Sequence, residues 1–155
     1  MIKICFVCLG NICRSPMAEF FMKDLIVKNN LINSIYITSR ATSYEEIGNG
    51  IYPPAKDKLK KENIFFDNHK KATRLEKEDY EKYDYIIGME ERNIINIERI
   101  FNKHNPDKIK RLLDFSKNPR DIADPWYTNN FDKTYEDILE GCTFFLDFLI
   151  ENNIV

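Results

Sequence analysis

Short apolar runs alternate along the chain with longer stretches in which apolar residues recur every three or four positions. The apolar runs have the length of buried strands and cover residues 2–7, 34–38, 85–89 and 109–113. The stretches with helical spacing cover residues 16–29, 55–63, 90–103 and a last segment that starts at Thr134. Strands that alternate with helices are typical of a parallel sheet with right-handed crossovers. We therefore expect one domain over residues 1–155 with a three-layer α/β fold, in which helices flank a four-stranded parallel sheet.

Capping residues predict where these helices begin. Ser15 before Pro16 predicts an N-cap followed by proline at the first helical position. Thr134 and Asp137 resemble a capping box, which predicts that the last helix opens there, after a long polar loop over residues 114–130. The helical spacing predicts that the inward face of this last helix consists of Tyr135, Ile138, Leu139, Cys142, Phe145, Leu146 and Leu149.

Composition and charge narrow the functional classes. Hydrophobic residues make up 43% of the chain and charged residues 31%, and the net charge is −2, so nothing indicates a nucleic-acid or membrane partner. No stretch approaches the roughly 18 apolar residues of a membrane helix, and the N-terminus lacks the small-residue cleavage site of a signal peptide. We expect a cytoplasmic protein whose four cysteines are thiols.

The segment VCLGNICRSP, residues 7–16, lies where the first predicted strand passes into the first helix, which is where α/β sheets bind ligands. Backbone N–H groups of a short loop at a helix N-terminus form a nest for anions. Gly10 permits close approach to a ligand, Asn11 tolerates a left-handed backbone, and Arg14 offers a planar fork for two phosphate oxygens. The same positive field favours the thiolate of Cys8, and Ser15 is placed to hydrogen-bond that sulfur. We expect a phosphate-binding loop with Cys8 as nucleophile.

The cysteine spacing allows two other interpretations. Cys5 and Cys8 have the spacing of half a zinc site, but neither Cys142 nor the two histidines supply the other half. A redox pair would place both cysteines at a helix start, whereas Cys5 lies inside an apolar run. We therefore expect Cys5 and Cys142 to be core residues.

The segment VCLGNICRSPMAE, together with ATSYEEIGN at 41–49, KEDYEKYDYIIGM at 77–89, ADPWY at 123–127 and FDKTYEDI at 131–138, resembles the low-molecular-weight protein-tyrosine phosphatases over nearly the whole chain. The resemblance implies hydrolysis through a cysteinyl-phosphate without a metal or other cofactor. Cys8 would be the nucleophile, Arg14 the phosphate ligand and Asp124 the general acid and then the base. The phosphate-binding loop would comprise Leu9, Gly10, Asn11, Ile12, Cys13 and Ser15, with Ser39 supporting Asn11.

The residues alone leave more than one candidate for the general acid and for the walls of the substrate pocket. By position, Asp114 and Asp121 rival Asp124 in the loop after the fourth strand. The resemblance implies that Trp126 and Tyr127 wall the substrate pocket, although both residues also suit an anchor to the core. Tyr44 and Glu45 are the candidates for the opposite wall, where Glu45 and Glu46 would disfavour acidic phosphopeptides. His69 lies one residue from the position of a family histidine and is assigned no role.

Cys13 lies in the same loop as Cys8. The resemblance implies a reversible disulfide between them that protects the nucleophile from deeper oxidation, and the alternative is a small residue that lines the turn.

Three rival functions remain. An arsenate reductase needs a relay of further cysteines, and none lies between Cys13 and Cys142. A protein-arginine phosphatase resembles this loop with threonine in place of Ile12, whose bulk suits a phenyl ring better. A phosphate-binding module without turnover would lack the nucleophile or the acid. We expect phosphotyrosine proteins or small aryl phosphates as partners, and a monomer or weak dimer.

Overall fold

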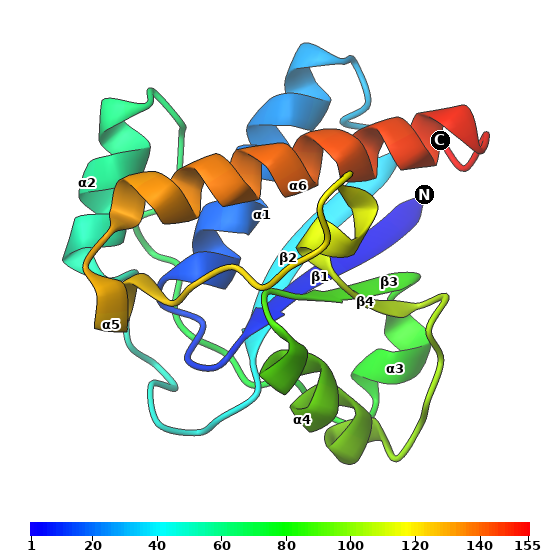
Figure 1. The fold of residues 1–155 in the computed structure, drawn as a ribbon, viewed down its shortest axis with the longest axis horizontal. Helices are drawn as coiled ribbons and strands as arrows, with labels where there is room; N and C mark the ends of the chain where they lie inside the picture. Colours follow the sequence, from blue (N-terminus) through cyan, green and yellow to red (C-terminus); the bar gives the residue numbers. More distant parts are fainter.

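The computed structural model describes all residues, 1–155, and contains one four-stranded sheet (Figure 1). Its strands are β1 (Ile2–Cys8), β2 (Ile35–Ala41), β3 (Tyr85–Gly88) and β4 (Ile109–Arg111), in the order β2-β1-β3-β4. All three neighbouring pairs are parallel. The predicted α/β class with a parallel sheet is confirmed.

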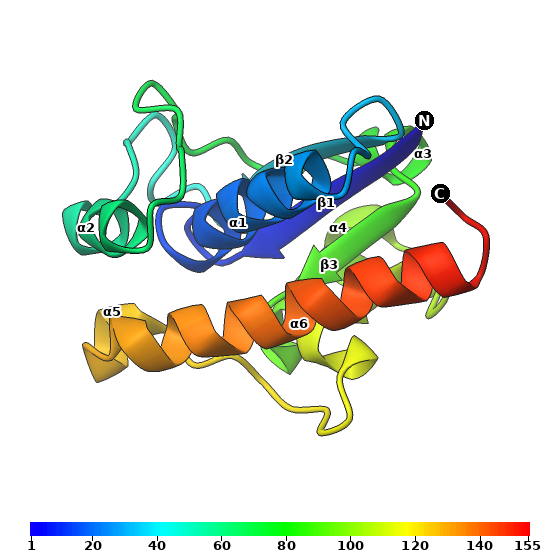
Figure 2. The same ribbon diagram turned by 90° about the horizontal axis from the view of Figure 1, so that it is seen from above.

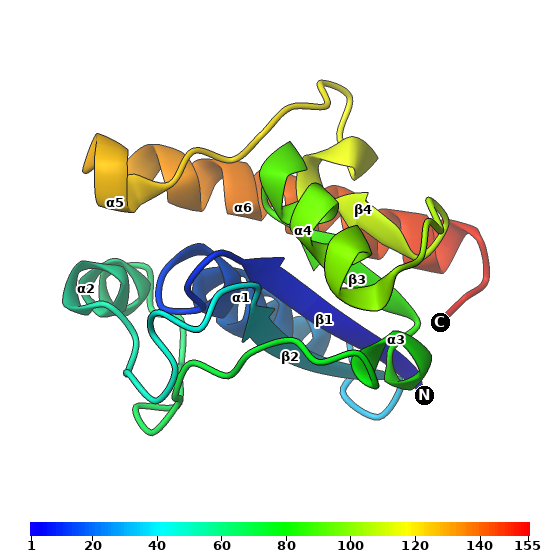
Figure 3. The same cartoon turned by 90° about the horizontal axis from the view of Figure 1, so that it is seen from below.

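Helices cover both faces of the sheet. One face is covered by α1 (Arg14–Lys28) and α6 (Phe131–Glu151), with α2 (Pro53–Lys61) beyond the end of α1 (Figure 2). The opposite face is covered by α4 (Glu91–Phe101) and by the short α3 (Asp79–Lys82) (Figure 3). The chain therefore forms the three layers that the alternation of strands and helices predicted.

The alternation of side chains along β1 explains why the core has two parts. Ile4, Phe6 and Cys8 point into the larger apolar cluster beneath α1 and α6. Cys5 and Val7 point into a smaller cluster beneath α4. Because successive side chains of a strand face opposite sides, a strand buried on both faces is apolar at every position. Cys5 and Cys142 are fully buried core residues, as expected.

Two predicted helix starts are wrong. Helix α1 begins at Arg14 with Cys13 as the N-cap, and Ser15 lies within the first turn because its hydroxyl is engaged inside the protein. Helix α6 begins at Phe131, where the side chain of Asn130 accepts the N–H of Lys133. The apparent capping box at Thr134 therefore lies inside the helix.

Three smaller differences follow from local geometry. Leu139 was expected to face the core but is 42% exposed, since it lies beside the buried stripe of α6 rather than within it. Strand β4 ends at Arg111, and residues Leu112–Phe115 form a 3₁₀ turn, η1. The four-residue helices α3 and α5 (Pro125–Thr128) are too short to show a period in the sequence.

None of the helices combines the length and the apolar character that a bilayer crossing requires.

Candidate active site

Residues 8–14 form a loop between the carboxyl end of β1 and the start of α1. Asn11 has a φ of 58°, the left-handed conformation that asparagine tolerates and most residues avoid. The loop is held from outside, because Ile12 accepts the backbone N–H of Tyr52 at 2.8 Å and Cys8 accepts that of Thr42 at 3.0 Å. Its shape is therefore fixed both by its own residues and by distant segments.

This loop forms the floor of a cavity whose walls come from two other segments. The cavity is lined by Cys8, Leu9, Gly10, Ile12, Cys13, Arg14, Glu45, Glu46, Asp124, Trp126 and Tyr127. Gly10 lies so close to the neighbouring wall that a Cβ atom there would come within 3.3 Å of Cγ of Glu46. The absence of a side chain at this position keeps the loop close to that wall.

The sulfur of Cys8 receives donors from its own loop. The backbone N–H of Asn11 donates to Sγ at 3.3 Å, and the Ser15 hydroxyl lies 3.0 Å from it. The Asn11 amide orients that hydroxyl, since Nδ2 donates to Ser15 Oγ at 2.8 Å while Oδ1 accepts the N–H of Thr73 at 3.1 Å. With its oxygen already accepting, Ser15 is free to donate its hydrogen to Cys8. Two hydrogen-bond donors therefore converge on the Cys8 sulfur from its own loop.

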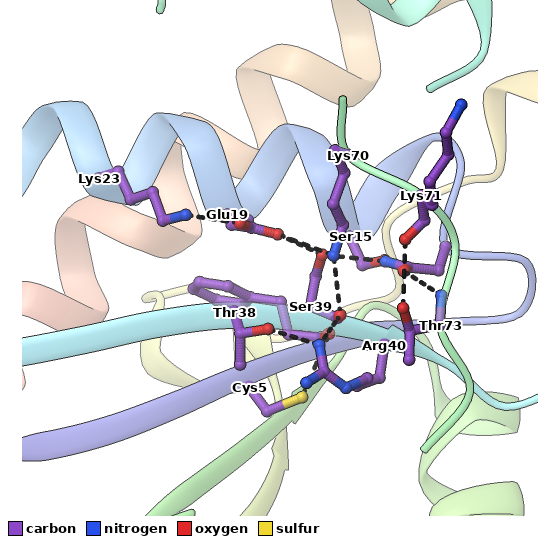
Figure 4. Close-up of polar contacts among 12 residues, drawn as sticks. Cys5, Ser15, Glu19, Lys23, Thr38, Ser39, Arg40, Lys70, Lys71 and Thr73 are labelled. Atoms are coloured by element: carbon purple, nitrogen blue, oxygen red, sulfur yellow. Dashed lines mark hydrogen bonds and ion pairs between the residues drawn. The ribbon is translucent and has the colours of Figure 1, made fainter. Parts of the chain in front are cut away.

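Glu19, Ser39 and Lys70 form a largely buried polar cluster beside the loop (Figure 4). Asn11 Nδ2 also donates to Ser39 Oγ at 2.9 Å, and the Ser39 hydroxyl donates to Glu19. Lys70 Nζ lies 3.4 Å from the carboxylate of Glu19 and donates to the Ser39 carbonyl at 3.1 Å. Since Glu19 takes the hydrogen of Ser39, the Ser39 oxygen is left as the acceptor for Asn11.

Glu19 and Lys70 were not identified from the sequence. The only available indication was one acidic residue between apolar neighbours on α1. Burial lowers the pKa of Lys70, and the charge of Glu19 opposes that shift. Lys70 directly follows His69, which was assigned no role and whose backbone N–H donates to Asp67 at 2.8 Å.

Arg14 brings the loop and the opposite wall together. Its buried guanidinium pairs with Glu90 at 2.7 Å, donates to the carbonyl of Ile122 at 2.8 Å and lies 3.5 Å from Oδ2 of Asp124. Burial opposes the charge of Arg14, but Cys8, Glu90 and Asp124 together hold its pKa above the ordinary value. Glu90 was also missed, although it lies two residues after the end of β3, at the edge of the sheet where ligands bind.

Asp124 is the N-cap of α5, which fixes its side chain. Its Oδ1 accepts the N–H of Trp126 at 3.0 Å, so Oδ2 is directed toward Arg14. Asp114 and Asp121, the rivals by position, both pair with Arg111, at 2.9 and 3.0 Å, and neither lines the cavity. Of the three aspartates, only Asp124 shares a cavity with Cys8.

The aromatic wall consists of Trp126 and Tyr127. The Trp126 ring packs on Tyr52 with 4.8 Å between centroids, so it both lines the cavity and anchors α5. Tyr127 also lines the cavity, but it is 79% exposed and therefore lies at the outer part of this wall.

The opposite wall differs from the expectation that Tyr44 and Glu45 form it. Tyr44 does not line the cavity, because its ring lies against the guanidinium of Arg74 at 4.2 Å. Glu45 and Glu46 form this wall, which is therefore acidic.

Cys13 lines the cavity beside Cys8 but differs from it in environment. It is buried, and burial, followed by the proximity of Cys8, raises its pKa above the ordinary thiol value. At neutral pH Cys13 is therefore a thiol rather than a competing nucleophile.

Known proteins resemble both the sequence and this geometry. The model of a family described as low molecular weight phosphotyrosine protein phosphatase matches residues 3–154. The low molecular weight protein-tyrosine-phosphatase PtpA of Staphylococcus haemolyticus (strain JCSC1435) is 37% identical over 153 residues, which cover 98% of this chain and 96% of that protein.

Solved structures of similar proteins share the fold of this chain. The crystal structure of YfkJ from Bacillus subtilis has a TM-score of 0.93 at 37% identity, covering 98% of this chain and 96% of that one. The crystal structure of DARP, drosophila arginine phosphatase, has a TM-score of 0.85 at 30% identity, covering 95% of this chain and 97% of that one.

Proposed function

The chain belongs to the low molecular weight protein-tyrosine phosphatase family, a family of hydrolases, and from this premise we propose that it hydrolyses phosphotyrosine through a cysteinyl-phosphate. The observation that supports the proposal most directly is the convergence of three groups on one cavity. These are the Cys8 sulfur with its two donors, the Arg14 guanidinium and the Asp124 carboxyl. They come from segments far apart in the chain, so we further propose that residues 1–155 act as one catalytic domain.

In the first step the Cys8 thiolate attacks phosphorus while the bond to the aryl oxygen breaks. Arg14 and the loop N–H groups hold the equatorial oxygens, and Asp124 gives its proton to the leaving phenolate. The arriving phosphate replaces Asp124 as the partner of the Arg14 Nη2 group, which lies 3.5 Å from Oδ2.

In the second step water attacks the cysteinyl-phosphate and gives a proton to Asp124, which now acts as the base. The sulfur–phosphorus bond breaks, and the products are inorganic phosphate and the Cys8 thiolate. Ser15, 3.0 Å from the sulfur, donates its hydrogen to the departing thiolate. The two-step reaction thus requires one nucleophile, Cys8, and one acid–base group, Asp124.

The cavity suits a phosphorylated aromatic ring. Ile12, Trp126 and Tyr127 supply apolar and aromatic surface around the floor of the cavity. A second candidate is phosphoarginine, because a structure similar to this one is that of an arginine phosphatase and because Glu45 and Glu46 would attract a guanidino group. We favour phosphotyrosine because the bulky apolar side chain of Ile12 on the cavity floor suits a phenyl ring better than a guanidino group.

The test compares phosphate release from a phosphotyrosine peptide and from a phosphoarginine peptide of the same sequence, with a chelator present. The wild type, Cys8→Ser and Ile12→Thr are assayed in parallel. Release from phosphotyrosine that is abolished in Cys8→Ser supports the proposal. Release mainly from phosphoarginine would refute phosphotyrosine as the substrate. An unchanged rate in Cys8→Ser would refute Cys8 as the nucleophile. Ile12→Thr is expected to shift the ratio of the two rates toward phosphoarginine.

A further inference from the structure

The loop that carries Asp124 is fastened to one face of α6 by side chains to which the proposed chemistry gives no role. We propose that Thr134 and Asp137 of α6, together with Arg120 of the loop, are positioning residues that hold Asp124 where it protonates the leaving group. The proposal rests on the proposed function, because it concerns the general acid of that reaction.

Thr134 holds the residue directly before the acid. It is buried, and its hydroxyl donates to the carbonyl of Ala123 at 3.1 Å. A threonine inside a helix ordinarily turns its hydroxyl to solvent or to the carbonyl four residues earlier. Here the hydroxyl leaves its own helix to bind the loop, which fixes the backbone from which Asp124 projects.

Arg120 holds the loop four residues before the acid. Its guanidinium donates to Asp137 at 2.8 Å and makes a two-pronged contact with Glu140 at 3.0 and 3.1 Å. Its Nη1 group also donates to the carbonyl of Asn118 at 2.8 Å, so one side chain ties two parts of the loop to the helix. Asp137 is almost completely buried, a setting in which a carboxylate is costly unless it is paired.

A third attachment lies on the other side of the loop. The Ile122 N–H donates to the carbonyl of Met89 at 2.9 Å, and Arg14 donates to the Ile122 carbonyl. The loop is thus held from two directions, through the side chain of Arg120 and through the backbone of residues 122 and 123. General acid catalysis needs the proton within hydrogen-bond reach of the leaving oxygen, and a misplacement of about 1 Å costs up to about 100-fold in rate.

The experiment measures kcat/KM for a series of aryl phosphates from p-nitrophenyl phosphate, a good leaving group, to phenyl phosphate, a poor one. The variants are Thr134→Val, Thr134→Ser and Arg120→Met. Lys133→Met is the matched control, since Lys133 also pairs with Asp137, at 3.1 Å, but this ion pair lies within α6 and does not join the helix to the loop. Thermal unfolding and inhibition by orthovanadate show whether each variant keeps its fold and its phosphate site.

We expect Thr134→Val and Arg120→Met to lower kcat/KM for phenyl phosphate about 10-fold, in the range of a partly lost general acid, with little change for p-nitrophenyl phosphate. Thr134→Ser and Lys133→Met should behave as the wild type does. An equal loss across the series, or no loss, would overturn the positioning role. Asp124→Asn in the same series separates the two proposals. If the loss of kcat/KM in Asp124→Asn does not depend on the leaving group, Asp124 is not the general acid. If the loss depends on the leaving group in Asp124→Asn but not in Thr134→Val or Arg120→Met, only the positioning role is refuted.

Discussion

The largely buried cluster of Glu19, Ser39 and Lys70 makes a sharp prediction, because two lysines contact the same carboxylate in different surroundings. Lys70 lies 3.4 Å and Lys23 2.6 Å from Glu19, yet the side chain of Lys70 is only 12% exposed and that of Lys23 is 43% exposed. We expect Lys70→Met to destabilise the protein far more than Lys23→Met, although Lys23 makes the shorter contact.

The expected magnitudes follow from burial. Lys70→Met removes a charged donor from the carbonyl of Ser39 and a partner from a buried carboxylate, and a hydrogen bond to a charged group contributes about 1.5–3 kcal/mol. Methionine recovers part of this by filling the same volume, so we expect a loss of about 2 kcal/mol. Lys23 pairs with Glu19 near the surface, where such pairs contribute about 0–1 kcal/mol.

The assay is urea unfolding followed by far-UV circular dichroism, with the free energy of unfolding extrapolated to water. Equal costs for the two variants, or a cost for Lys70→Met below about 0.5 kcal/mol, would refute the argument that burial governs the contribution of Lys70. A difference in the expected direction should be accompanied by slower turnover in Lys70→Met only, because only that lysine contacts Ser39, the partner of Asn11.

Three further predictions concern the cavity. Ser15→Ala removes the hydroxyl 3.0 Å from the sulfur, and losing about 1.5–3 kcal/mol of stabilisation of the departing thiolate should slow the second step about 10- to 150-fold. A burst of p-nitrophenol before a slow steady state would show this, and an unchanged kcat would contradict it. Iodoacetamide should alkylate Cys8 well before Cys13, whose pKa is raised by burial, and inorganic phosphate should protect Cys8; peptide mass mapping checks the order, and early labelling of Cys13 would count against it. Replacing Glu45 and Glu46 by lysine should raise kcat/KM for phosphotyrosine peptides with acidic flanks and leave neutral peptides nearly unchanged, whereas an equal change for both would show that these charges do not select substrates.

The sequence alone determined the elements whose residues are neighbours in the chain. The strand, the loop and the helix that surround Cys8 follow one another over residues 2–28, so apolar spacing, Gly10 and Asn11 sufficed to predict an anion loop with a thiol at its base. The parallel sheet was also predictable, because strands that alternate with helices leave few other topologies.

Only the tertiary structure decided the partners that act on this loop from a distance. Glu90 is 76 residues from Arg14, and the amide of Asn11 accepts the N–H of Thr73, 62 residues away. A charged residue on a helix or after a strand has the same local pattern whether it faces water or a buried arginine, so its role cannot be inferred from neighbours in the chain.

The start of α6 illustrates the same limit. Thr134 and Asp137 have the spacing of a capping box, and local preference therefore favoured a helix that begins there. In the folded chain these side chains bind the loop that carries Asp124, and Asn130 supplies the cap instead. Short-range propensities are worth about 1 kcal/mol, and contacts with a distant segment outweigh them because a buried polar group must find a partner wherever the fold provides one.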